Sequence, residues 1–178
     1  QRYFILKTYI LNITRAKSSD ASLKSLEVTN FNINPEFDSE TLEYTLTIDP
    51  YTKSLDIISK ASNENANIKI LANSNFKVGQ NIVTIQVIAE DGTIRNYILN
   101  VIKQASTNNY LSSLDIDNYD ITNEFNKNIT EYYIEVENDV KTLKLTGTPE
   151  DSLSTVEGNG IYSLQTGENE IFITVTSE

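Results

Sequence analysis

Apolar and polar residues alternate along most of this chain. Residues 83–89 place Val, Ile, Val and Ala on one face of an extended segment, and residues 42–48 alternate in the same way. A period of two is the pattern of a β-strand with one face in a core. No stretch of useful length shows the helical period. The pattern therefore predicts an all-β protein.

Turn residues separate these alternating runs. Asp91-Gly92 lies between two of them and predicts a two-residue β-hairpin. Short strands at this spacing are typical of an antiparallel sandwich of about seven strands. We expect strands near residues 23–29, 31–33, 42–48, 55–60, 67–71, 81–90 and 93–103.

The whole pattern recurs after 88 residues. Tyr9-Ile10-Leu11-Asn12 reappears as Tyr97-Ile98-Leu99-Asn100. Other landmarks recur in the same register: Leu23 with Leu111, Phe37 with Phe125, Tyr44 with Tyr132, and Gly79 with Gly167. A period this long indicates a repeated domain rather than a solenoid unit.

The repeat predicts three segments. Residues 1–15 match the end of a repeat and are expected to be the closing strand of a preceding one. Residues 16–105 form a complete sandwich, and residues 106–178 form a second β-sandwich repeat that lacks its closing strand. Because the chain contains no Met and Gln1 is not a native start, we expect it to be part of a longer protein.

A set of short motifs occurs in fixed order along the repeat. They are Leu23-x-x-Leu26-x-Val28, Pro35-x-Phe37-Asp38, Tyr44, Gly79-x-Asn81-x-Val83 and Asp91-Gly92-Thr93, followed by Tyr97-Ile98-x-x-Val101. Together they resemble the bacterial cadherin-like β-sandwich repeat, although the last copy has Asn123 in place of the proline. The resemblance implies tandem antiparallel Ig-like or cadherin-like sandwiches. It also implies a non-catalytic role on a large secreted or surface protein of bacteria.

Composition narrows the possible chemistry. The net charge is −11, from 25 acidic and 14 basic residues, which disfavours binding to nucleic acid or to an anionic lipid surface. No apolar run approaches the ~20 residues of a membrane span, so we expect no membrane insertion. The chain has no Cys and no His. It therefore cannot build a Ser-His-Asp or Cys-His arrangement, and we expect no catalytic residue and no cofactor.

Three weaker possibilities remain open. Asp115, Asp117 and Asp120 form an acidic cluster that invites a calcium site, since hard cations take several oxygen ligands. The cluster sits inside a strand pattern rather than at a joint between domains, which favours a solvated strand face. Ten tyrosines without Trp make a weak case for stacking on carbohydrate. An intramolecular Lys–Asn isopeptide bond would suit a Cys-free extracellular sandwich, but the sequence does not pair the residues.

We assign structural roles to the landmark residues. Tyr44 and Tyr132 each follow a phenylalanine by seven residues and are expected to anchor the core, with the hydroxyl reaching backbone at a strand corner. The other structural residues are Phe37, Gly79, Asp91, Gly92 and Tyr97 in the first repeat, with Phe125 and Gly167 in the second.

The function that fits these features is that of a non-catalytic spacer and interaction module, extending to adhesion, of a bacterial cell-surface or secreted protein. Its protein or glycan ligand is not identified by the sequence. The alternative is an accessory glycan-binding module of a polysaccharide-degrading enzyme, which a planar strip of exposed tyrosines on one sheet face would favour.

Self-association is a further hypothesis. Tyr9, Leu11 and Ile13 match Tyr97, Leu99 and Val101 of the closing strand, while residues 169–177 are expected to form a strand without a closing partner. We therefore expect residues 3–14 of one molecule to complete the second repeat of another by strand exchange.

Overall fold

The computed structural model describes residues 3–121 and 124–178, and the described residues contain eleven β-strands. The described residues contain no helix that is long and apolar enough to cross a lipid bilayer. The chain divides into two units, Gln1–Lys103 and Gln104–Glu178, which are described separately below.

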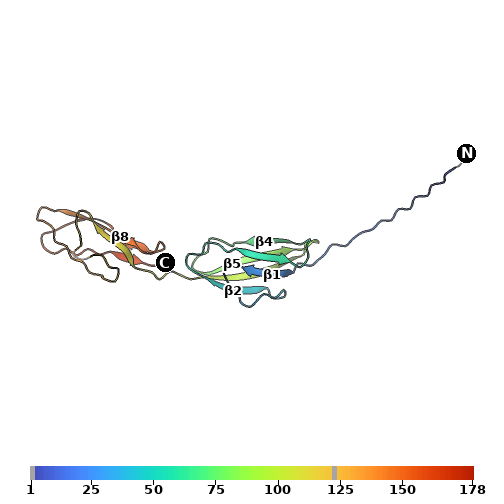
Figure 1. The fold of residues 1–178 in the computed structure, drawn as a ribbon, viewed down its shortest axis with the longest axis horizontal. Helices are drawn as coiled ribbons and strands as arrows, with labels where there is room; N and C mark the ends of the chain where they lie inside the picture. Colours follow the sequence, from blue (N-terminus) through green and yellow to red (C-terminus); the bar gives the residue numbers. More distant parts are fainter. Residues whose placement is uncertain (1–2, 122–123) are drawn as a thin grey trace. The chain divides into compact units, whose positions relative to one another are not determined.

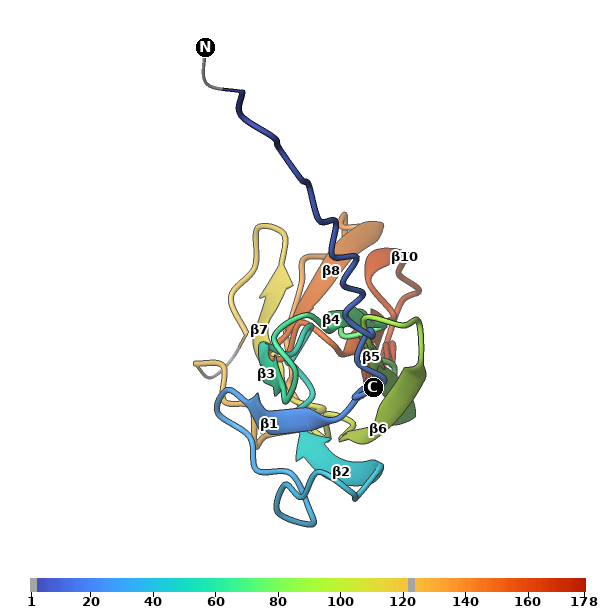
Figure 2. The same cartoon turned by 90° about the vertical axis from the view of Figure 1, so that its right-hand side faces the viewer.

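Unit 1 is a two-layered β-sandwich (Figures 1 and 2). Its strands are β1 (Leu23–Val28), β2 (Glu43–Ile48), β3 (Ile57–Ala61), β4 (Asn67–Leu71), β5 (Gly79–Ile88) and β6 (Ile94–Lys103). One sheet has the order β1-β3 and the other the order β2-β6-β5-β4. Neighbouring strands are antiparallel except for β2 and β6, which run parallel. Strand β6 therefore lies in the interior of the larger sheet.

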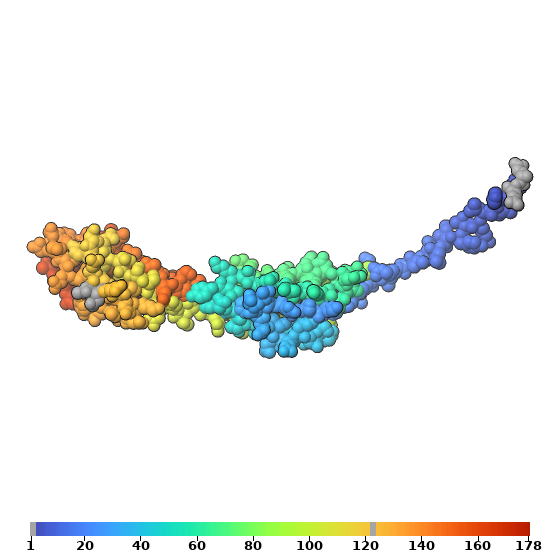
Figure 3. Space-filling view, in the orientation of Figure 1, coloured from blue at the N-terminus to red at the C-terminus, as the bar shows by residue number. Residues whose placement is uncertain are grey.

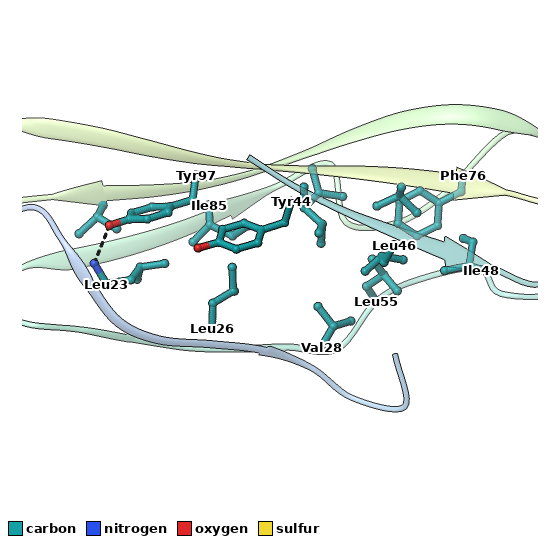
Figure 4. Packing of buried hydrophobic residues seen from close by; sticks show 14 of the residues in the cluster. Leu23, Leu26, Val28, Tyr44, Leu46, Ile48, Leu55, Phe76, Ile85 and Tyr97 are labelled. Atoms are coloured by element: carbon teal, nitrogen blue, oxygen red, sulfur yellow. Dashed lines mark hydrogen bonds between the residues drawn. The ribbon is translucent and has the colours of Figure 1, made fainter. Parts of the chain in front are cut away.

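The core of unit 1 lies between the two sheets, as Figure 4 shows. Every second residue of β5 and β6 points into it. The fully buried side chains at these positions are Val83, Ile85, Val87, Tyr97, Leu99 and Val101, each 0% exposed. The predicted inward face of residues 83–89 is confirmed. Phe37 and Ile57 pack against this core and are partly buried.

Two local predictions for unit 1 are wrong. Residues 31–33 form no strand, because Phe31 and Asn34 make only isolated bridges to Val28 and Thr45. The hairpin between β5 and β6 has three loop residues rather than two, closed by the Ala89 N–H to Thr93 carbonyl bond at 2.8 Å. Only Gly92 in this loop has a positive φ, 95°, whereas a two-residue type I′ turn needs two such residues.

The segment that precedes β1 forms no strand in this chain, in contrast to its alternating pattern. Residues 3–22 carry no regular secondary structure, because a β-ladder needs a second strand and none lies beside them here. The large apolar side chains of residues 3–13 are exposed, including Tyr9 at 80% and Leu11 at 81%. Figure 3 shows this segment in dark blue without a covering layer of protein.

Unit 2 contains the same repeat with fewer strands. They are β7 (Leu111–Ile116), β8 (Thr142–Pro149), β9 (Thr155–Glu157), β10 (Gly160–Ser163) and β11 (Thr174–Thr176). The sheets have the orders β10-β8-β7 and β11-β9. Leu143 and Leu145 are buried at 6% and 7% exposure. Asn123, the counterpart of Pro35, lies outside the described residues.

Two segments of unit 2 differ from their counterparts in unit 1. Residues 131–136 match β2, and residues 167–173 match the first part of β5, yet neither segment is a strand. In unit 1, β6 hydrogen-bonds to both β2 and β5. Residues 104–178 contain no counterpart of β6, so both segments lack the ladder that orders them in unit 1.

Candidate functional site

Strand β6 carries the residue that joins the two layers of unit 1. The Tyr97 hydroxyl accepts the Leu23 N–H at 3.0 Å and donates to the Ser39 carbonyl at 2.8 Å. Figure 4 shows the first of these bonds between the sheets. A buried hydroxyl with both a donor and an acceptor partner incurs little desolvation penalty. Tyr97 therefore fixes β6 to the opposite sheet as well as filling the core.

A second tyrosine anchor occurs in both units. The Tyr44 hydroxyl donates to the Asp38 carbonyl at 2.6 Å and accepts the Asp38 N–H at 3.2 Å. Tyr132 makes the same two bonds with Asn126, at 2.7 and 2.8 Å. The predicted contact of each hydroxyl with strand-corner backbone is thus present. Burial raises the pKa of Tyr44 above its ordinary value, because the ionised phenolate loses its hydration.

Each anchor is supported by a stacked aromatic ring. Phe37 and Tyr44 have ring centroids 6.2 Å apart with an interplanar angle of 25°. Phe125 and Tyr132 stack at 6.0 Å and the same angle. Both repeats therefore contain the same corner, in which a phenylalanine ring stacks on the tyrosine ring and the tyrosine hydroxyl bonds to backbone.

Glycine and asparagine build a second repeated corner. Gly79 has a φ of 88° and Gly167 a φ of 100°, in a region that strongly favours glycine. The Asn81 side chain accepts the Lys77 N–H at 2.9 Å and donates to the Lys77 and Gly79 carbonyls at 2.7 and 3.0 Å. Asn169 makes the same three contacts in unit 2. This Gly-x-Asn motif therefore has a structural role, because it fixes the turn through which the chain enters the strand.

The β5–β6 hairpin holds the segment that enters unit 1. The Asp91 N–H donates to the Ser18 carbonyl at 3.1 Å, and the Ser18 N–H donates to the Glu90 carboxylate at 3.2 Å. The Arg15 guanidinium also donates to Glu90. The Ser18 N–H and then Arg15 lower the pKa of Glu90, because both favour its charged form. Sequence analysis missed this contact, although the repeat placed Arg15 and Ser18 just before β1.

The three candidate calcium ligands do not converge. Asp115 accepts the Ser113 hydroxyl at 2.9 Å, and Asp117 lies 3.7 Å from the Lys144 ammonium. Asp120 is exposed. Among the described residues, no group of three or more acidic side chains is arranged to hold a metal ion.

The exposed tyrosines of the two units do not share a strand face. Tyr51 follows β2 in a turn, Tyr110 precedes β7, and Tyr133 lies in the segment that matches β2. The outward face of β5 and β6 instead carries isoleucine and amide side chains, with Gln86 donating to Asn96 at 3.2 Å. In the described part of unit 1, no tyrosine lies on that face, so it offers no aromatic platform.

A shallow polar hollow lies between the turns after β1 and β2. Its acidic groups already have partners. Asp49 accepts the Thr52 hydroxyl and the Tyr51 N–H at 2.5 and 2.7 Å, and Asp56 accepts the Thr29 hydroxyl at 2.8 Å. The Thr52 hydroxyl and the Tyr51 N–H lower the pKa of Asp49, which keeps the carboxylate ionised and acceptor-only. Asp49 thus stabilises its own turn, and Asp56 joins the turn after β1 to the segment before β3.

Comparison with known families agrees with this architecture. The profile of the Cadherin-like beta sandwich domain matches the chain twice, over residues 23–104 and 111–178. The chain belongs to this family. The first cadherin-like match spans all six strands of unit 1, and the second spans the five strands of unit 2. The expected tandem cadherin-like repeats are thereby confirmed. No curated protein and no solved structure shows significant similarity to the chain.

Membership of the family also bears on the class of function. Cadherin-like β-sandwich domains are generally non-catalytic structural or interaction modules, and they are typically extracellular. The repeated tyrosine and Gly-x-Asn corners, which use their polar groups to hold backbone, agree with a structural module.

Proposed function

We propose that this chain is a non-catalytic spacer, with a role in adhesion, of a bacterial cell-surface or secreted protein. The observation that carries the proposal is the position of the entry and exit of unit 1. The entering segment is bound at Ser18 to Asp91, just before β6 begins. The chain leaves after Lys103, at the other end of the same strand. A ten-residue strand spans about 30 Å, so passage through the unit advances the chain by that length.

Both units bind their own entry segment. In unit 1, Ser18 is tied to Glu90 and Asp91 at the hairpin. In unit 2, the Tyr110 carbonyl accepts the Glu150 N–H at 2.9 Å, and Ser106 donates to the buried Asp151 carboxylate. A tether held at its ends by hydrogen bonds loses conformational freedom. This supports a stiff spacer rather than freely jointed domains.

The spacer proposal is tested by measuring the distance between the units. The chain has no cysteine, so spin labels can be placed at Lys60→Cys in unit 1 and Ser152→Cys in unit 2, both at exposed positions. A narrow distance distribution by pulsed electron resonance is expected. The control pair lies within unit 1. Lys77→Cys is just before the start of β5, and Ile94→Cys is in β6 opposite the last residue of β5. A distribution between units that is several times wider than the control would contradict the stiff spacer.

Absence of catalysis is part of the same proposal. We expect no turnover of glycan, ester or peptide substrates above the buffer rate. Reproducible turnover that a single carboxylate substitution abolished would contradict the non-catalytic assignment.

A further inference from the structure

The sequence of strand β6 occurs a second time in an exposed segment. Residues 6–15 match β6 position by position, and the four residues Tyr-Ile-Leu-Asn are identical at 9–12 and 97–100. In β6 the inward residues Tyr97, Leu99 and Val101 are each 0% exposed. Their counterparts Tyr9, Leu11 and Ile13 are 80%, 81% and 81% exposed. The segment thus has the inward face of a core strand without a core to bury it.

Unit 2 contains the two segments that would flank this strand. In unit 1, β6 lies between β2 and β5, and the inward residues of both neighbours are buried. In unit 2 the matching residues are only half-buried, and they are Tyr132, Ile134, Val136, Ile171 and Ile173. Unit 2 therefore has partly exposed apolar side chains on both sides of the position that β6 occupies in unit 1.

The exposed segment adds no like charge to its proposed neighbours. The outward positions of the two flanking segments carry four exposed glutamates, Glu131, Glu135, Glu168 and Glu170. The outward positions of residues 6–14 carry only uncharged side chains, so insertion places no further negative charge beside these glutamates.

We propose that residues 6–14 of one molecule insert into unit 2 of a second copy of this chain, between residues 131–136 and residues 167–176. The register follows from unit 1, where Leu99 pairs with Tyr44 on one side and with Val83 on the other. Leu11 accordingly lies opposite Tyr132 in a parallel pair and opposite Ile171 in an antiparallel pair. The interaction is β-strand addition that completes a sheet. It goes beyond the spacer function and does not depend on it.

The Tyr9 hydroxyl has a defined role in this arrangement. Tyr97 accepts the Leu23 N–H and donates to the Ser39 carbonyl in unit 1. The equivalent partners in unit 2 are the Leu111 N–H and the Lys127 carbonyl. Tyr9 of the donor therefore joins the inserted strand to the opposite sheet of the acceptor.

The first test compares two aspartate substitutions on opposite faces of the segment. Sedimentation equilibrium of the 178-residue chain is expected to show concentration-dependent association. Leu11→Asp, at an inward position, should weaken it by at least tenfold. Thr8→Asp adds the same charge at an outward position, whose counterpart Asn96 is exposed in β6, and should change it by less than about threefold. A monomer at all concentrations, or equal loss in both variants, would overturn the proposal.

The second test fixes the register and the acceptor. Asn100 pairs with Ile82 in unit 1, so Asn12 should lie opposite Glu170 of the second copy. A mixture of Asn12→Cys and Glu170→Cys chains, oxidised with diamide, should yield the mixed disulfide as the main product. The matched control replaces Glu170→Cys by Ile82→Cys, the same position in a unit where β6 is already in place. Equal yields with both partners would show nonspecific contact and overturn the proposed register.

Discussion

Ile85 in unit 1 and Ile173 in unit 2 occupy equivalent positions of the repeat, yet their surroundings differ. Ile85 is 0% exposed between two sheets, whereas Ile173 is only half-buried. The difference extends to the backbone, because residues 43–48 form a strand and residues 131–136 do not. Similar alternating sequence thus gives a ladder only where a partner strand is present.

The corners of the two units differ far less than their strands. Asn30 and Asn118 both have positive φ angles, 66° and 65°. The Tyr44 and Tyr132 hydroxyls bind the same backbone groups. These features depend on residues close together in the sequence. The comparison therefore separates local structure, which each repeat forms by itself, from sheet structure, which requires β6.

The largest expected effect distinguishes the two cores. Ile85→Asp places an unpaired charge in a fully buried site and should reduce the stability of unit 1 by on the order of 4 kcal/mol. Ile173→Asp should reduce the stability of unit 2 by only about 1–2 kcal/mol, because water already reaches that site. Hydrogen exchange followed by mass spectrometry reports each unit separately. Thr84→Asp, on the outward face of β5, is the control and should leave exchange nearly unchanged. Native protection of residues 81–101 in Ile85→Asp would show that the core assignment is wrong.

The tyrosine corners should show a smaller difference between the units. Tyr44→Phe removes a hydroxyl that holds both backbone groups of Asp38 in a buried corner, and should cost unit 1 about 1–2 kcal/mol. Tyr132→Phe should cost unit 2 less than about 1 kcal/mol, since water can replace the half-exposed hydroxyl. The exchange rates of the Asp38 and Asn126 amides measure the two effects. A larger loss at Asn126 than at Asp38 would contradict this ranking.

The Gly-x-Asn corners should respond alike in both units. Asn81→Ala and Asn169→Ala each remove the side chain that accepts one N–H and donates to two nearby carbonyls, and each should cost about 1 kcal/mol. Asn81 also donates to the Val101 carbonyl of β6 at 3.5 Å, a long bond that should add little. Faster exchange of the Lys77 and Gln165 amides would report the loss. Asn81→Asp keeps the acceptor oxygen and should give an intermediate effect. Unequal losses in the two units would mean that the corner depends on the completed sheet.

Acid should give the smallest effect, and unit 1 should show it. The folded state lowers the pKa of Asp20, Asp49, Glu90 and Asp91 in unit 1. In unit 2, it lowers that of Glu150. A carboxyl group whose pKa is lowered by folding stabilises the folded state at pH values above its ordinary pKa, which is 3.8 for Asp and 4.5 for Glu. That stability is lost as the pH falls below these values.

Urea unfolding at pH 6 and at pH 3, resolved by unit, would measure this acid effect. The carboxylates are exposed, so screening keeps each contribution small. Thr52→Val removes the first hydrogen-bond donor to Asp49 and should reduce the acid sensitivity of unit 1. An unchanged midpoint across this pH range in unit 1 would contradict the assignment.

Much of unit 1 could be predicted from its sequence because each strand has one apolar face. The alternation in residues 83–89 located β5 and its buried side, and Tyr44 was identified as a corner residue from its distance to Phe37. The segment before β1 was predicted as a strand for the same reason, but it is not a strand in this chain. Alternation specifies which face a strand would bury and does not supply its partner.

The tertiary structure decided three features that the pattern of residues left open. Strands β2 and β6 pair in parallel, and nothing in the alternation of either strand specifies direction. Arg15 and Ser18 contact Glu90 across 75 and 72 residues of sequence. Such contacts form only after the hairpin has been placed beside the entry segment.

The sequence by itself therefore determined the local structure of the repeat. It specified the Gly-x-Asn corner, the tyrosine corner and the face that each strand buries, and both units retain these features. The hydrogen bonds that the two units share at these corners join residues at most six apart, so little chain entropy is lost in forming them. Ladders join distant segments, and their backbone groups need a partner strand. For that reason, β6 determined which alternating segments became a sheet.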